Sequence, residues 1–232
     1  MRRRFRPGTL ALVGVVWVAA SCTFDGAAPG DPLADASSDD ASSSVDASRP
    51  TTTPVGQWTF NSGSELVDTQ GNFPDLVLNG SADVAAGQLD VNGSGTSSTG
   101  WAVTGDAPGL YSGPEIVDKT LVSWITLEQL QSSGIFAGSA ITIDRESSDH
   151  FDGVIYGERE MDRWMSGSSG FNRTNDFSPG FQESMAGVEV MVVITYDDVD
   201  DMPGGTLDIT GYRDGVVIGS YSTCLLYTSP SP

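Results

Sequence analysis

Short stretches of alternating apolar and polar residues run along most of the chain, separated by turn residues. The clearest stretch is 188–196, where every second residue is Val, Ile or Tyr and lies on one face of an extended strand. Only 127–132 hints at a helix, and it is short. Further strands are expected at 57–60, 76–79, 88–91, 119–127, 140–144, 153–156, 163–166, 207–213 and 216–221. Asp214-Gly215 favours positive φ and predicts a hairpin between the last two strands. Many short strands with regular turns indicate an all-β sandwich or barrel.

The N-terminal residues have the pattern of an export signal. Arginines at positions 2, 3, 4 and 6 precede an apolar run from Leu10 to Ala20. A run of about a dozen residues is too short to span a bilayer as a helix, but it suits a signal peptide. The run ends at Cys22 and resembles the lipobox of bacterial lipoproteins, which implies a signal peptide of residues 1–21 and an acylated Cys22. The small residues Ala19 and Ser21 also fit ordinary signal peptidase, which would release a soluble protein.

Composition changes on both sides of the strand-rich region. Residues 22–54 are rich in Asp, Ser, Ala, Thr and Pro, which predicts a disordered tether. A globular domain is expected at 55–223. Residues 224–232, CLLYTSPSP, resemble a translated sequencing adapter, although a short natural tail is the alternative. We therefore expect an artefactual tail and a C-terminally truncated domain.

Charge and cysteine content exclude several classes of partner and site. The formal net charge is −20, and it becomes −24 without residues 1–21, which carry four arginines and no acidic residue. Such a chain repels nucleic acid and anionic lipid headgroups, so no nucleic-acid partner is expected. The only cysteines are Cys22 and Cys224, which rules out a disulfide framework within the domain. His150 is the only histidine, so a zinc site or a Ser–His pair is not expected.

Several motifs together are similar to one known family. In order they are QWTF at 57–60, GQLDV at 87–91, LVSWI at 121–125, VITYDD at 193–198 and YRDGVVIGSY at 212–221. They resemble the laminin-G-like, concanavalin A-like family. The resemblance covers 55–221 and implies an antiparallel jelly-roll β-sandwich. The closing strands of that family, which pair near the first strand, are missing, and this also implies truncation.

Aromatic and charged residues are dense between 151 and 174. Aromatic faces stack on sugar rings, and charged side chains bind sugar hydroxyls, so the candidate ligand-binding residues are Asp152, Glu158, Arg159, Trp164 and Arg173. The alternative is that the aromatic residues fill the core. Glu158, Glu160 and Asp162 alternate, but residues i and i+4 of a strand lie about 13 Å apart, too far for a glycosidase pair. We assign no catalytic residue and expect a solvated charged turn.

A cluster of aspartates follows the strand at 188–196. Calcium binds six to eight oxygen ligands, and laminin-G-like domains often hold it at the rim of the sandwich. The candidate calcium ligands are Asp197, Asp198, Asp200 and Asp201, with Asp68 as a possible addition. No cofactor is required by the sequence. No P-loop or Rossmann fingerprint occurs in the sequence.

These features predict an exported, lipid-anchored bacterial module at the outer membrane or cell surface. Glycans are the expected ligands, and contact with the membrane is expected through the lipid anchor alone. The alternatives are a β-sandwich glycan hydrolase or lyase, and a protein-binding or structural spacer module. A secreted or periplasmic location is the alternative to the anchored one.

Overall fold

The molecule is built from antiparallel β-sheets. The computed structural model describes residues 53–91, 100–104, 110–116, 118–131, 137–144, 151–198 and 205–224, and the backbone of a strand at 16–20. Apart from one 3-10 turn, Ser169–Phe171, the regular elements of these residues are strands. This confirms the expected all-β class. Within the described part of the chain, no helix is long and apolar enough to cross a membrane.

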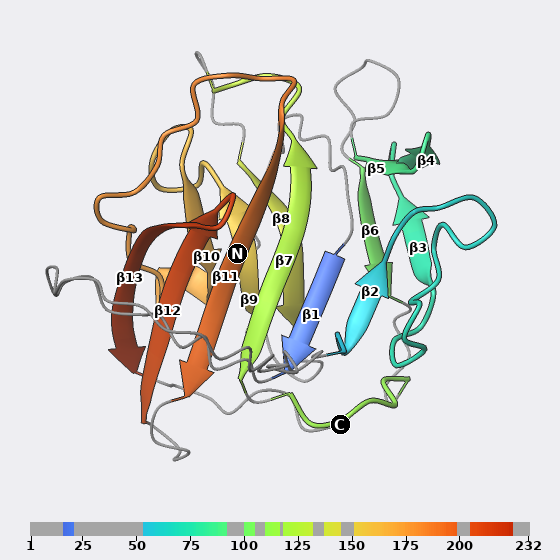
Figure 1. Cartoon of the computed structure of the whole chain (residues 1–232), viewed down its shortest axis with the longest axis horizontal. Helices are drawn as coiled ribbons and strands as arrows, with labels where there is room; N and C mark the ends of the chain where they lie inside the picture. The colour runs from blue at the N-terminus through green and yellow to red at the C-terminus, as the bar shows by residue number, and fades with distance from the viewer. Residues whose placement is uncertain are drawn as a thin grey trace, which may run out of the picture.

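The largest sheet has six strands in the order β13-β12-β11-β7-β1-β2, and Figure 1 shows it across the front of the molecule. Its strands are β1 Val16–Ala20, β2 Gly56–Trp58, β7 Lys119–Thr126, β11 Glu189–Asp198, β12 Thr206–Arg213 and β13 Val216–Cys224. Alternate residues of β7 and β11 are buried, so one face of the sheet forms a side of the core.

A three-stranded sheet, β10-β9-β8, covers that buried face (Figure 1). Its strands are β8 Gly138–Asp144, β9 Phe151–Tyr156 and β10 Trp164–Gly167. The main core contains Leu121 and Ile194 from the large sheet and Val154 from the small one. The two sheets therefore pack face to face, as two layers with an apolar interior.

Two small sheets stand beside this pair of layers. They join β3 Leu76–Asn79 to β6 Trp101–Thr104, and β4 Asp83–Ala85 to β5 Gln88–Asp90. A second apolar cluster forms here around Trp58, Phe60 and Leu89. This cluster also contacts Ile141 of β8, so it adjoins the main core.

Most strands expected from the alternation are present, with ends shifted by a few residues. Strands β4 and β6 were not expected, because neither has a long alternating pattern. The helical hint was wrong over the described residues 127–131, which have no helical structure. Strand β13 continues to Cys224, which pairs with Thr206 and has a free, exposed thiol.

Strand β1 lies inside the large sheet although it belongs to the predicted signal peptide. It pairs antiparallel with β2 through Val16–Val18 and antiparallel with β7 through Trp17–Ala20. Strands β2 and β7 are therefore parallel to each other and separated by the width of one strand. β2 is the outer strand of the sheet, and its inner edge is paired with β1.

Candidate functional site

Two of the expected ligand residues form a buried ion network. The carboxylate of Asp152 lies 2.9 Å from Lys119 Nζ and 2.5 Å from Arg173 Nη2, and all three residues are buried. Beside them, the hydroxyl of Tyr196 donates to the carbonyl oxygen of Gly153 at 2.8 Å. Burial raises the pKa of Tyr196 well above its ordinary value. Asp152 and Arg173 thus neutralise each other inside the protein, where an unpaired charge would be costly.

Trp164 is a core residue, in agreement with the alternative that the aromatic residues of 151–174 fill the core. Its side chain is 2 % exposed, and its ring packs 4.9 Å from that of Tyr156. The indole Nε1 donates to Glu183 Oε1 at 2.8 Å, and Arg213 binds both oxygens of Glu183. A crevice beside Trp164 has a volume of about 10 Å³, which is room for about one water molecule. This placement leaves no space for a sugar at Trp164.

The alternating acidic residues lie in the turn that joins β9 to β10. Gly157 and Asp162 have φ angles of 72° and 58°, which interrupt the extended backbone. Asp162 is buried and accepts hydrogen bonds from Tyr156 Oη at 2.8 Å and from the backbone N–H of Gln131 at 2.7 Å. The expectation of a solvated turn was therefore wrong for Asp162. Partial burial raises the pKa of Glu158.

Arg159 lies at the surface of the same turn. Its guanidinium binds both carboxylate oxygens of Asp176, at 2.9 and 3.2 Å. It also lies 5.7 Å from the centre of the Phe171 ring. Arg159 is the expected ligand residue that the structure leaves most accessible, but its donors already have protein partners.

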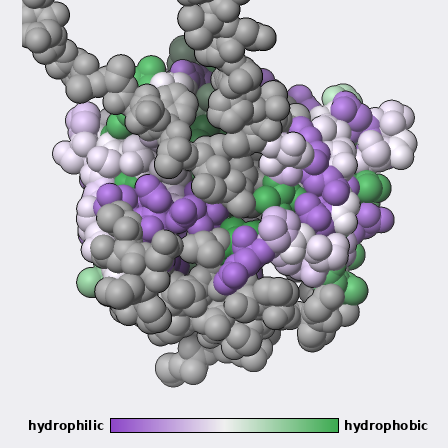
Figure 2. All heavy atoms as spheres, turned by 60° about the horizontal axis from the view of Figure 1, so that its bottom comes forward, coloured by the Kyte–Doolittle hydropathy of each residue, from purple (hydrophilic) through white to green (hydrophobic). Residues whose placement is uncertain are grey.

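The structure describes two of the four aspartates expected to bind calcium at the end of β11. Asp197 is exposed and Asp198 is buried, whereas Asp200 and Asp201 lie outside the described residues. Desolvation raises the pKa of Asp197, and the nearby Asp118, Asp208 and Asp198 raise it further. Figure 2 shows hydrophilic residues on the described part of the surface at the lower end in Figure 1, with hydrophobic and near-neutral residues among them. Within the described ranges, no group of three or more His, Cys, Asp or Glu residues could hold a metal ion. Calcium at this loop stays a prediction.

Asp68 organises a loop instead of projecting toward a rim. Its side chain is buried, and its two oxygens accept hydrogen bonds from the backbone N–H groups of Gln57, Gln70, Asn72 and Phe73, at 2.7 to 3.1 Å. These bonds use the oxygen atoms that a calcium ion would need. An aspartate that binds backbone N–H groups ahead of it in the chain is a common turn signal, and this signal was available in the sequence.

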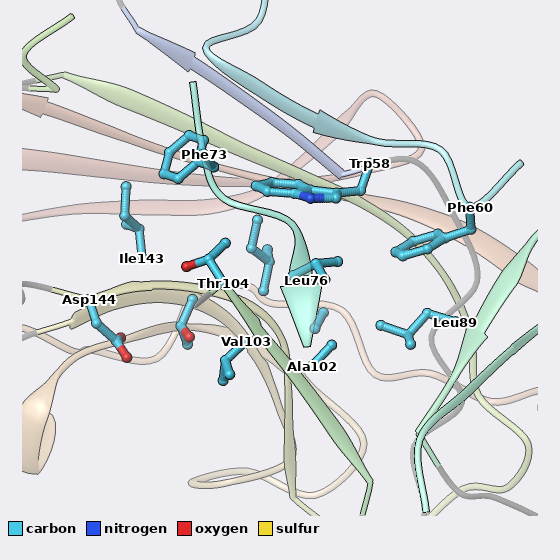
Figure 3. A pocket seen from close by; sticks show the side chains of 13 residues that line it. Trp58, Phe60, Phe73, Leu76, Leu89, Ala102, Val103, Thr104, Ile143 and Asp144 are labelled. Carbon is cyan, nitrogen blue, oxygen red and sulfur yellow. The ribbon is translucent and has the colours of Figure 1, made fainter. Parts of the chain in front are cut away.

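A cavity of about 260 Å³ opens between β8 and the β3–β6 sheet (Figure 3). We call it the Trp58 pocket. Most of the described residues that line it are apolar, and three of these, Trp58, Phe60 and Phe73, are aromatic. It is lined by Trp58, Phe60, Phe73, Leu76, Leu89, Ala102, Val103, Thr104, Ala140, Ile141, Thr142, Ile143 and Asp144. None of the five ligand residues expected from the sequence belongs to this lining.

A few polar groups give the Trp58 pocket its chemistry. The Nε1 atom of Trp58 is buried and has no hydrogen-bond partner among the described residues. In Figure 3 this nitrogen lies on the edge of the ring nearer to Leu76. Asp144 is exposed at the rim, and desolvation together with the negative charge of Asp152 raises its pKa. Apolar walls with a few fixed polar groups are typical of small-molecule sites.

The aromatic wall is held by the Asp68 loop. Phe73 packs 5.5 Å from Trp58 and 4.7 Å from Tyr111, measured between ring centres. Desolvation and the charge of Asp68 raise the pKa of Tyr111 to about 12. The Asp68 carboxylate binds the backbone on both sides of this wall, at Gln57 and at Phe73. The loop therefore fixes the positions of Trp58 and Phe73 relative to each other.

Comparisons with protein-family models, with curated proteins and with solved structures give no match to this chain. The resemblance to laminin-G-like domains therefore stays a prediction.

Proposed function

We propose that this protein is an exported, non-catalytic binding module that holds a glycan end in the Trp58 pocket. In this proposal the domain is a jelly-roll sandwich of the laminin-G type, anchored through a lipid on Cys22. The ligand site differs from the one expected at 151–174, because Asp152, Trp164 and Arg173 are buried with protein partners. The single observation that carries the proposal is the combination of aromatic walls and a buried, unpartnered donor in one cavity.

The chemistry of the pocket suits a sugar ring. Apolar ring faces pack on aromatic side chains such as Trp58 and Phe73, while hydroxyl groups need polar partners. The indole N–H of Trp58 offers a donor that lacks a partner, and a buried polar group without one costs free energy. A ligand oxygen would remove that cost. Asp144 at the rim and the hydroxyl of Thr104 supply the remaining polar contacts.

A binding role is better supported than glycan hydrolysis. Hydrolysis needs two carboxyl groups about 5 to 9.5 Å apart on opposite sides of the scissile bond. Among the described residues that line the Trp58 pocket, Asp144 is the only one with a carboxylate. Asp152, whose charge raises the pKa of Asp144, forms ion pairs with Lys119 and Arg173.

The test is a glycan array probed with the full chain and with two matched aromatic variants. Phe73→Ala removes a pocket wall, whereas Phe171→Ala removes a ring on the far 3-10 turn. Loss of one stacking ring should reduce affinity about ten- to a hundredfold, and Phe171→Ala should bind like the original chain. Circular dichroism confirms that each variant is folded. Equal binding by both variants would contradict the proposed site, and release of reducing ends by the unmodified chain would make it a hydrolase.

A further inference from the structure

Asp144 brings a negative charge to the Trp58 pocket and has no ion-pair partner among the described residues. It is the last residue of β8, and the register places it opposite Phe151 of β9. The described residues also give it no hydrogen-bond partner. Every other described residue of the pocket lining is uncharged. The described part of the pocket therefore carries one charge, and that charge is negative.

The cations of the described ranges are bound elsewhere. These basic residues are Lys119, Arg159, Arg163, Arg173 and Arg213. Each of them forms an ion pair with an acidic residue other than Asp144. Desolvation and the negative charge of Asp152 raise the pKa of Asp144, so its surroundings disfavour the ionised carboxylate. A positive charge on the ligand would compensate for both effects.

The aromatic residues of the Trp58 pocket also favour a cation. Ammonium groups are attracted to the faces of aromatic rings, and the attraction is stronger where water is excluded. Figure 3 shows Asp144 on the same side of the pocket as Phe73, whereas Phe60 and Leu89 lie on the other side. The pocket thus has an end with a carboxylate and an aromatic ring, and an end that is apolar.

We propose that the glycan held in the Trp58 pocket ends in an amino sugar whose protonated amino group pairs with Asp144. This inference rests on the proposed glycan-binding function and adds the class of sugar. The carboxylate stabilises the protonated amine, and the amine stabilises the carboxylate. A hydroxyl group of a neutral sugar can donate to Asp144, but it brings no positive charge. An acidic sugar is disfavoured, because the described lining offers no cation and the chain has a formal net charge of −20.

The test is a glycan array on which amino sugars are shown in matched pairs. Each pair presents the same terminal amino sugar, in the gluco, galacto or manno configuration, once as the free amine and once N-acetylated. Matched neutral hexoses and uronic acids complete the array. The proteins are the full chain and its Asp144→Asn and Glu189→Gln variants. Glu189 is exposed and pairs with Thr126, at the other end of β7 from Lys119, so its variant controls for the loss of one negative charge.

In at least one pair the free amine should bind the full chain about tenfold more tightly than the N-acetylated form, as expected for one hydrogen bond between charged groups. This preference should disappear in Asp144→Asn and persist in Glu189→Gln, with circular dichroism confirming that both variants are folded. Three results would overturn the inference and leave the proposed function standing: equal binding of the paired forms, tighter binding of uronic acids, or an amine preference that survives Asp144→Asn. Absence of binding to every glycan would overturn both.

Discussion

Replacing Asp68 by asparagine is the sharpest test of how the Trp58 pocket is held together. The buried carboxylate accepts four backbone N–H groups, two at each oxygen. Asparagine replaces one oxygen by an NH₂ group, which then faces two other donors. Hydrogen bonds to a charged group contribute about 1.5–3 kcal/mol each, so losing two should lower the free energy of unfolding by about 3–6 kcal/mol. For a domain of this size the melting temperature should fall by about 6–24 °C.

The measurement is urea denaturation of the Asp68→Asn and Asp75→Asn variants, followed by circular dichroism. Asp75 is exposed and lies in the same region of sequence, so its variant controls for the loss of one negative charge. The Asp75 variant should stay within about 0.5 kcal/mol of the original chain. If Asp68→Asn also stays within that range, the four hydrogen bonds do not hold the loop, and the explanation of the pocket wall is refuted.

Three further predictions concern the buried indole, the rim carboxylate and the N-terminus. Trp164→Phe removes the bond to Glu183 and should cost about 1.5–3 kcal/mol in unfolding free energy, while unchanged glycan binding would confirm that Trp164 is a core residue. The raised pKa of Asp144 means that its ionised form is disfavoured in the folded state. As pH rises from the ordinary value of 3.8 through the folded pKa of Asp144, the original chain should therefore lose stability relative to the Asp144→Asn variant. Thermal melting measures this difference, and a gain in relative stability over the same pH window would contradict the prediction. Mass spectrometry of chain exported by a Gram-negative host should find an acylated Cys22 as the first residue, and a free thiol or another cleavage site would remove the anchor.

Alternation along the chain was sufficient to predict the long strands. Strand β11 has buried residues at every second position, and this is why its pattern was readable. The Asp214-Gly215 hairpin was also predictable, because both residues adopt positive φ, at 48° and 79°. The short strands β4 and β6 gave no such signal, since three or four residues do not establish a period.

The ligand site could not be predicted from local pattern. The aromatic and charged residues of 151–174 suggested binding, yet burial decided their roles: Trp164 pairs with Glu183 and Arg173 with Asp152. Those partners are 19 and 21 residues away in sequence, and their choice depends on how the sheets pack. The Trp58 pocket brings together β2 and β8, which are more than seventy residues apart. No periodicity within either strand shows that the other lies opposite.

The central claim is that a ligand oxygen accepts a hydrogen bond from the indole N–H of Trp58. The most direct measurement is an NMR spectrum of the indole N–H groups of ¹⁵N-labelled protein, titrated with a glycan that binds on the array. The signal of Trp58 is assigned by its loss in Trp58→Phe. It should move downfield on binding, while that of Trp164, which already donates to Glu183, should stay in place. A glycan that binds without moving the Trp58 signal would contradict the account.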